Sequence, residues 1–204
     1  SEGRTNIARM KLDYIWSPLK DVYARLDLGL IEEMYGGAGG EILYRPYKSK
    51  YALGLVAHRV KKRGYKQRFS FRDYTVNTGY FQMYYDWPGE VTSQVLLGKY
   101  LAGDKGMTLD LSKRFKTGFR LGIFATKTNV STEIFGEGSF DKGFYFEFPT
   151  DIFLSTYQPG SISMGLHPLT KDGGAPLLNH NALIGLVSGS GYYGIERDWE
   201  DILD

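Results

Sequence analysis

The sequence predicts an all-β protein: an antiparallel up-and-down meander that forms a transmembrane β-barrel or half of a larger barrel. Three observations lead to this prediction. Apolar and polar residues alternate with period two along most of the chain. Several alternating segments reach about the 9–11 residues that a tilted strand needs to cross a bilayer, longer than the usual 5–6. The composition, with 26 Gly, 16 Tyr and 12 Phe among 204 residues, suits strands and tight turns.

The alternation is clearest in the segments that begin at Val22, Tyr51, Met107 and Phe119. In the first of them, apolar side chains share one face and polar or small residues take the other: Val22, Ala24, Leu26, Leu28 and Leu30 against Tyr23, Arg25, Asp27 and Gly29. In a membrane barrel the apolar face meets lipid and the polar face lines the interior. We therefore expect Leu109, Leu111, Leu121 and Ile123 to point outward, and Asp110, Ser112 and Arg120 inward.

Turn signals divide the chain into ten strands and two weaker ones. The turns are Gly36–Gly40, Lys62–Tyr65, Trp87–Glu90, Gly103–Gly106 and Phe115–Gly118. The strands are expected near residues 6–16, 21–32, 40–48, 50–62, 66–73, 76–87, 91–102, 106–115, 117–128 and 143–149, with weaker ones near 160–166 and 181–187. We expect a barrel domain over residues 1–194, closed alone or with an absent N-terminal part, and an acidic tail over 195–204.

Composition excludes several classes of function. The chain has no Cys, which excludes disulfide scaffolds, thiolate zinc sites and cysteine nucleophiles. No apolar run approaches the roughly 18 residues of a transmembrane helix. A net charge of +2 does not indicate nucleic-acid binding. The sequence does not start with Met and has no apolar signal segment, so we expect a mature form or a fragment of a longer protein.

No catalytic set is recognisable in the sequence. His58, His167 and His180 do not lie at metal-ligand spacing. Ser188–Gly191 lacks the pattern of a nucleophile elbow, and no dinucleotide or phosphate loop is present. We therefore expect no enzymatic activity, no catalytic residues, no metal and no cofactor.

One basic run is a candidate binding site. From Arg59 to Arg72 the chain has seven Lys or Arg and no acidic residue. The candidate residues for a polyanion are Arg59, Lys61, Lys62, Arg63, Lys66 and Arg68. At a hairpin tip they would suit lipopolysaccharide phosphates or an acidic polysaccharide. Nucleic acid and a merely solvated hairpin end are the alternatives.

Aromatic residues lie near several expected strand ends: Tyr14, Trp16, Tyr74, Trp87 and Tyr100. Membrane barrels place Tyr and Trp in girdles at the two interfaces of the bilayer. This placement agrees with a membrane barrel, although aromatic residues also fill the cores of sandwiches.

Three ordered blocks, Gly98–Gly106, Gly136–Gly143 and Leu169–Gly174, resemble the YjbH/GfcD-type family of exopolysaccharide and group 4 capsule biosynthesis. The resemblance runs from Tyr14 to Asn181 and fits that family's C-terminal portion. It implies a barrel in the outer membrane of a Gram-negative bacterium that exports polysaccharide with small periplasmic and lipoprotein partners. The partners implied are outer-membrane lipid, lipopolysaccharide, polysaccharide and other export proteins, without nucleic acid. The family defines no catalytic residues.

Three other functions fit parts of the pattern. A general porin or adhesin would use the same architecture. A lipase-type barrel would need a Ser and His on one strand face, and none is visible. A soluble carbohydrate-binding β-sandwich would also show alternation. A barrel needs detergent for extraction and a sandwich does not, so extraction distinguishes them.

Overall fold

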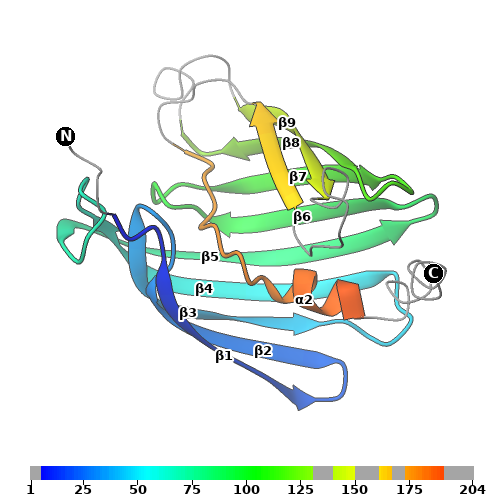
Figure 1. Ribbon diagram of the computed structural model, residues 1–204, viewed down its shortest axis with the longest axis horizontal. Coiled ribbons are helices and arrows are strands. Elements are labelled where there is room, and N and C mark those ends of the chain that lie inside the picture. The colour runs from blue at the N-terminus through cyan, green and yellow to red at the C-terminus, as the bar shows by residue number, and fades with distance from the viewer. Residues whose placement is uncertain (1–5, 131–139, 150–160, 167–172, 191–204) are drawn as a thin grey trace, which may run out of the picture.

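The computed structural model of the chain describes residues 6–130, 140–149, 161–166 and 173–190. Within them ten strands form one antiparallel sheet in sequence order, so the predicted meander is confirmed (Figure 1). The strands are β1 (Met10–Leu19), β2 (Val22–Leu30), β3 (Tyr35–Tyr44), β4 (Tyr51–Arg63), β5 (Phe71–Trp87), β6 (Val91–Lys99), β7 (Lys105–Arg114), β8 (Arg120–Thr128), β9 (Asp141–Pro149) and β10 (Ser161–Leu166). Among the described residues the sheet does not close into the expected barrel, and β1 and β10 lie at its two edges.

One segment that follows β10 in sequence crosses the concave side of the curved sheet (Figure 1). This crossing segment, Gly173–Ser190, ends in the helix α2 (Leu183–Ser190). No helix in the described part of the chain is long and apolar enough to span a membrane. The expected tail at 195–204 and His167 lie outside the described residues.

The expected faces of the strands are confirmed. Leu109 and Ile123 are 48% and 55% exposed on the outer face, whereas Ser112 is buried on the inner face. Ladder register joins the outward residues into apolar rows. One row crosses β3 to β7 through Ile42, Leu55, Phe81, Leu97 and Met107. A second crosses β7 to β10 through Leu111, Ile123, Phe144 and Leu166. All nine side chains are exposed.

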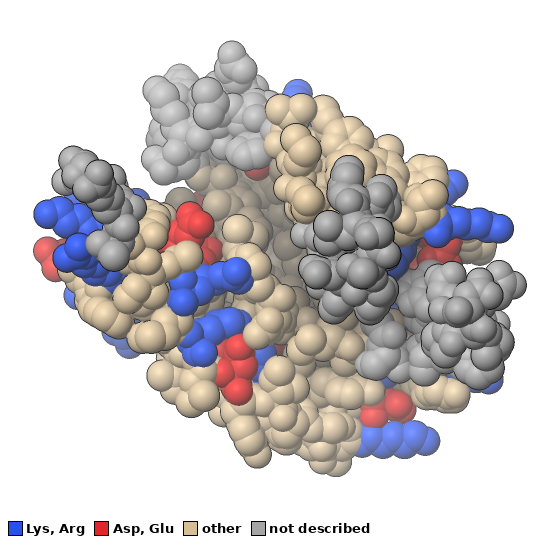
Figure 2. Space-filling model, viewed as in Figure 1, with Lys and Arg blue, Asp and Glu red and all other residues tan. Residues whose placement is uncertain are grey.

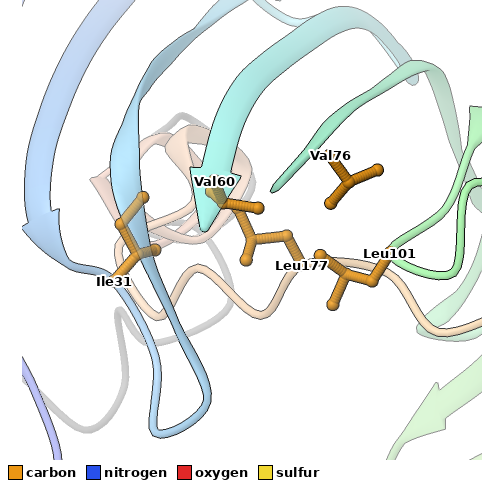
Figure 3. Packing of buried hydrophobic residues seen from close by; sticks show 5 residues of the cluster. All are labelled: Ile31, Val60, Val76, Leu101 and Leu177. Atoms are coloured by element: carbon orange, nitrogen blue, oxygen red, sulfur yellow. The ribbon is translucent and has the colours of Figure 1, made fainter. Parts of the chain in front are cut away.

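Two clusters of buried apolar residues lie between the sheet and the crossing segment. One cluster joins Leu177 of that segment to Ile31, Val60, Val76 and Leu101 (Figure 3). A second joins Leu183 to Leu43, Ala52 and Tyr84. Burying a leucine side chain contributes about 1.5–3 kcal/mol. The crossing segment therefore completes both cores.

Two expected strand boundaries were wrong. Gly36–Gly40, expected as a turn, lies inside β3, where these small residues make room for neighbouring strands and side chains. Residues 66–73 and 76–87, expected as two strands, contribute to the single strand β5. The β4–β5 turn is instead Gly64–Ser70, closed by the hydrogen bond from the Gly64 N–H to the Ser70 carbonyl at 2.9 Å.

The weak strand expected at 181–187 was also wrong, because this stretch begins the helix α2. Leu183, Ile184 and Val187 pack on the second core cluster, and their spacing places them on one face of a helix. A short apolar run does not by itself distinguish a strand from a buried helix. Tyr100, expected in an interfacial girdle, is buried and shares a hydrogen bond of 2.7 Å with the Thr108 hydroxyl.

Candidate functional site on the inner face of the sheet

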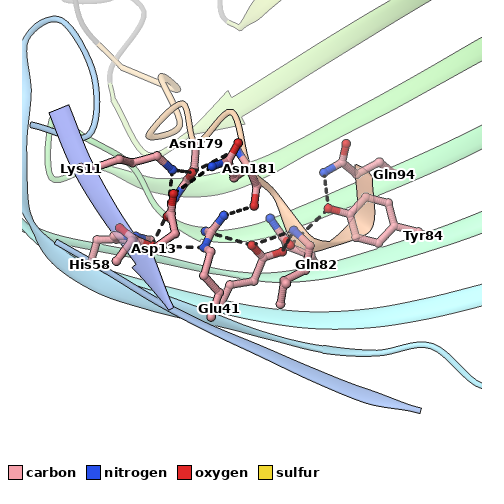
Figure 4. A network of polar contacts seen from close by, with 12 residues as sticks. Lys11, Asp13, Glu41, His58, Gln82, Tyr84, Gln94, Asn179 and Asn181 are labelled. Carbon is pink, nitrogen blue, oxygen red and sulfur yellow. Dashed lines mark hydrogen bonds and ion pairs between the residues drawn. The ribbon is translucent and has the colours of Figure 1, made fainter. Parts of the chain in front are cut away.

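Four ionisable side chains lie together on the inner face, with at most 1% of each side chain exposed. The Arg25 guanidinium lies 3.3 Å from Asp27 Oδ2 and 3.0 Å from Glu41 Oε2. His58 Nε2 lies 2.9 Å from Asp27 Oδ1. We call Arg25, Asp27, Glu41 and His58 the buried charge cluster. Figure 4 shows two of its members, Glu41 and His58, beneath Asn179 and Asn181 of the crossing segment.

Strand register explains how these side chains meet. Arg25 and Glu41 are direct partners across β2 and β3. Asp27 and His58 lie on strands that are not adjacent, and both pair with Gly39 of the strand between them. A Cβ at Gly39 would overlap the His58 ring. Glycine therefore lets the imidazole lie over β3 and reach the carboxylate.

The crossing segment binds to this cluster through polar groups. The Asn179 amide donates to Asp27 Oδ2 at 3.2 Å, and the Leu183 N–H donates to the two Glu41 carboxylate oxygens at 3.2 and 3.1 Å. Arg25 donates to the Asn181 carbonyl. Removing one partner of a buried charge pair typically costs about 3–5 kcal/mol. The cluster thus holds the segment in place.

β1 supplies further contacts to the same segment. Lys11 Nζ donates to Asn179 Oδ1 at 2.6 Å and forms an ion pair with Asp13 at 3.0 Å. The Asn181 amide donates to Asp13 Oδ2 at 2.8 Å. Lys11 and Asp13 therefore bind each other, and each also binds one asparagine of the crossing segment.

The start of the crossing segment is held at the end of the sheet near the β2–β3 turn. The N–H groups of Gly174, Leu177 and Leu178 donate to Asp104 Oδ2, the Tyr80 hydroxyl and Glu32 Oε2, at 2.8, 3.0 and 3.0 Å. Glu32 lies between β2 and β3, and burial raises the pKa of its carboxyl above 4.5. His180 is exposed in the segment, and among the described residues no three or more His, Asp or Glu form a metal-binding group.

Comparison with known proteins identifies the family. The profile of a family described as "Exopolysaccharide biosynthesis protein YbjH" matches residues 1–188. The chain belongs to this YjbH family. It is 44% identical over 160 residues to "Uncharacterized lipoprotein YjbH" of Escherichia coli (strain K12). That match covers 76% of this chain and 23% of the relative, so the chain spans less than a quarter of the relative's length. No solved structure matches the chain.

In this YjbH-family chain the basic residues predicted as a polyanion site divide into two groups. Arg59, Lys61, Lys66 and Arg68 are exposed, and Lys62 is half-buried. Figure 2 shows Lys and Arg side chains gathered at the end of the sheet where the β4–β5 turn lies. The four exposed residues, which we call the basic tip, form an accessible cationic surface.

Arg63 has a different place from its neighbours, because it is fully buried. The four N–H groups on its Nη1 and Nη2 atoms are shared among six backbone carbonyls, at 2.7–3.3 Å from these nitrogens. The acceptors are Ile7, Ala8, Glu32, Glu33, Gln67 and Arg68. Arg63 therefore ties the N-terminal stretch, the β2–β3 turn and the β4–β5 turn together. Its place in a charge run gave no signal of this role.

Proposed function

We propose that this chain is a non-catalytic β-barrel segment of the bacterial outer membrane that takes part in exopolysaccharide biosynthesis and export. The observation that supports this proposal is the contrast between the two faces of one sheet. Exposed apolar side chains lie on the outer face of every strand from β1 to β10, and the inner face holds the buried charge cluster. Membership of the exopolysaccharide biosynthesis family supplies the process.

The outer face exposes more apolar surface than is usual for a protein in water. Exposed apolar side chains lie on all ten strands, and Leu12 and Leu28 pair with each other across β1 and β2. Contiguous exposed apolar patches on soluble monomers rarely exceed a few hundred Å². A membrane barrel requires this arrangement, with apolar residues outward and polar residues inward along each strand.

The two open edges of the sheet must be paired if the sheet lies in a membrane. In hydrocarbon each unpaired backbone N–H or C=O costs several kcal/mol, so β1 and β10 need partners. The relative is more than four times as long as the matched region. We propose that the two edges close on each other or on further strands of a longer protein.

The remaining partners follow from the surfaces. We propose that the basic tip contacts lipopolysaccharide phosphates or acidic polysaccharide, because its exposed Lys and Arg reach solvent at one end of the sheet. Other export proteins would complete the pathway. A soluble carbohydrate-binding sandwich is less well supported, since the described strands form one sheet and not two packed sheets.

Two measurements test the proposed function. The protein should remain in the membrane fraction after salt and alkaline washes and leave it only with detergent. Deleting its gene should lower secreted polysaccharide while hydrolase and transferase activities persist. A protein that stays monodisperse in water without detergent, or a deletion that leaves secretion unchanged, contradicts the proposal.

A further inference from the structure

A cavity of about 510 Å³ lies at the end of the sheet opposite the basic tip. Its walls come from the inner face of β5 to β9 on one side and from α2 on the other. Small-molecule sites usually measure about 300–1,000 Å³. The cavity is therefore large enough for a ligand, and it does not overlap the buried charge cluster.

Planar polar side chains cover its floor. Tyr84 shares a hydrogen bond of 3.1 Å with the Gln94 amide, and the Tyr145 hydroxyl donates to Asp110 Oδ1 at 3.0 Å. Tyr145 reaches Asp110 because its ring lies over Gly122, its ladder partner, where a Cβ would overlap the ring. Each of these two pairs thus places a hydrogen-bond donor beside an acceptor.

The charge of the cavity is nearly balanced. Among the described residues, four Lys or Arg and three Asp or Glu line it. Arg45 pairs with Asp86 at 2.9 Å, and Arg120 lies 3.8 Å from Glu147 with 39% of its side chain exposed. A polyanion would favour an excess of cations, whereas sugar hydroxyls both donate and accept and suit adjacent opposite groups.

The wall formed by α2 includes an unexpected glycine. Gly185 lies within the helix, where glycine costs about 1 kcal/mol relative to alanine. A Cβ there would meet no atom within 4 Å, although Gly39 and Gly122 on the sheet are crowded. Packing therefore does not account for Gly185, which leaves the cavity open on this side.

We propose that this cavity binds a short stretch of a glycan chain through its hydroxyl groups. The half-buried Tyr145 supplies apolar ring surface for the sugar, while Gln94, Asp110 and Arg120 supply hydrogen bonds. The inference rests on the proposed function and locates the contact with the polysaccharide on the inner face. It differs from the basic tip, where charge alone would select the ligand.

The test is a titration of the purified full chain, in detergent micelles, with maltohexaose, cellohexaose and laminarihexaose, and with hexagalacturonate as the acidic probe. We expect at least one neutral hexasaccharide to bind with a Kd that does not change between low and moderate salt. Gly185→Trp should weaken this binding at least tenfold by filling the cavity. Leu186→Trp, the matched control at an exposed position of the same helix outside the cavity lining, should leave it unchanged. Arg120→Gln, at a partly exposed side chain, should weaken it about tenfold.

Each outcome decides the inference. It is overturned if no neutral hexasaccharide shows saturable binding, if only hexagalacturonate binds, or if Gly185→Trp and Arg120→Gln both leave the Kd unchanged. Replacing Lys61 and Lys66 of the basic tip by Gln should not alter neutral binding. A protein that needs detergent but binds none of the neutral probes retains the proposed function and loses this inference. If the chain binds a neutral hexasaccharide but is soluble without detergent, the glycan site is retained and the proposed membrane location is lost.

Discussion

His58 on β4 reaches across β3 to Asp27 on β2, and His58 Nε2 lies 2.9 Å from Asp27 Oδ1. Gly39 makes this contact possible, because both residues pair with it in the ladders. The same carboxylate accepts from Asn179 of the crossing segment, so the contact between two strands also positions the segment over the sheet.

Gly39→Ala should lower stability by about 1–3 kcal/mol, because the added methyl group overlaps the His58 ring and the Ala57 carbonyl. The midpoint of thermal unfolding in detergent would measure the change. Gly185→Ala is the matched control, since its methyl group enters open space and removes a helix glycine. It should raise the midpoint, and equal effects of the two substitutions would contradict this account.

Glu32 should make stability decrease as pH rises. Burial raises the pKa of this carboxyl in the folded protein above the ordinary 4.5. A raised pKa means that the folded state binds the proton more tightly than the unfolded state. The contribution to stability is therefore complete below about pH 4.5 and is lost as pH rises through the folded pKa.

Glu32→Gln tests this pH dependence. The amide oxygen of glutamine still accepts the hydrogen bond from the Leu178 N–H, now 3.0 Å from Glu32 Oε2, and carries no charge. We expect the variant to be at least as stable as the wild type at neutral pH and to have a flatter profile of unfolding midpoint against pH. An unchanged profile would show that Glu32 does not contribute.

Leu109→Arg should destabilise the chain in lipid bilayers by about 2–4 kcal/mol if Leu109 lies near the bilayer midplane. Leu109 lies on the outer face of β7, between Val95 and Ala125. Leu178→Arg is the matched control, because Leu178 is also exposed but lies on the crossing segment. Folding into vesicles followed by urea titration would measure both. A neutral effect of Leu109→Arg would argue against a lipid-facing surface.

Replacing Arg59, Lys61, Lys66 and Arg68 together with Gln should weaken binding to lipopolysaccharide and to an acidic glycan at low salt. Exposed charges are screened over about 8–10 Å at physiological ionic strength, so the loss should shrink as salt rises. Sedimentation with lipopolysaccharide aggregates would measure it. Unchanged binding by a folded variant would favour a solvated tip without a ligand.

Arg63→Gln tests whether the buried arginine of the same basic run has a structural role. It leaves several carbonyls that the buried guanidinium now satisfies without a donor, so it should destabilise the β4–β5 turn. Faster proteolysis of the turn at Lys66 or Arg68, without such a change in Lys61→Gln, is the expected result. Equal proteolysis of the two variants would contradict a structural role for Arg63.

The sequence by itself determined the antiparallel meander, the order of most strands and the face to which most strand side chains point. Leu109, Asp110 and Leu111 show why: side chains alternate with period two, so a local pattern predicts which residues share a face. The polar inner face was therefore predictable as a face, and the exposed Lys and Arg of the basic tip were predictable as a group.

Only the tertiary structure decided which inward residues meet. From sequence alone, Gly39 and Gly122 have no visible role beyond a turn or a strand. The ladder register of the folded sheet places the His58 and Tyr145 rings over them. Leu183 belongs to a short apolar run, and its helix forms where Glu41 binds the Leu183 N–H and the second core cluster takes up its side chain. Contacts such as these join residues far apart in sequence, so they depend on register and curvature and leave no periodic signal in the chain.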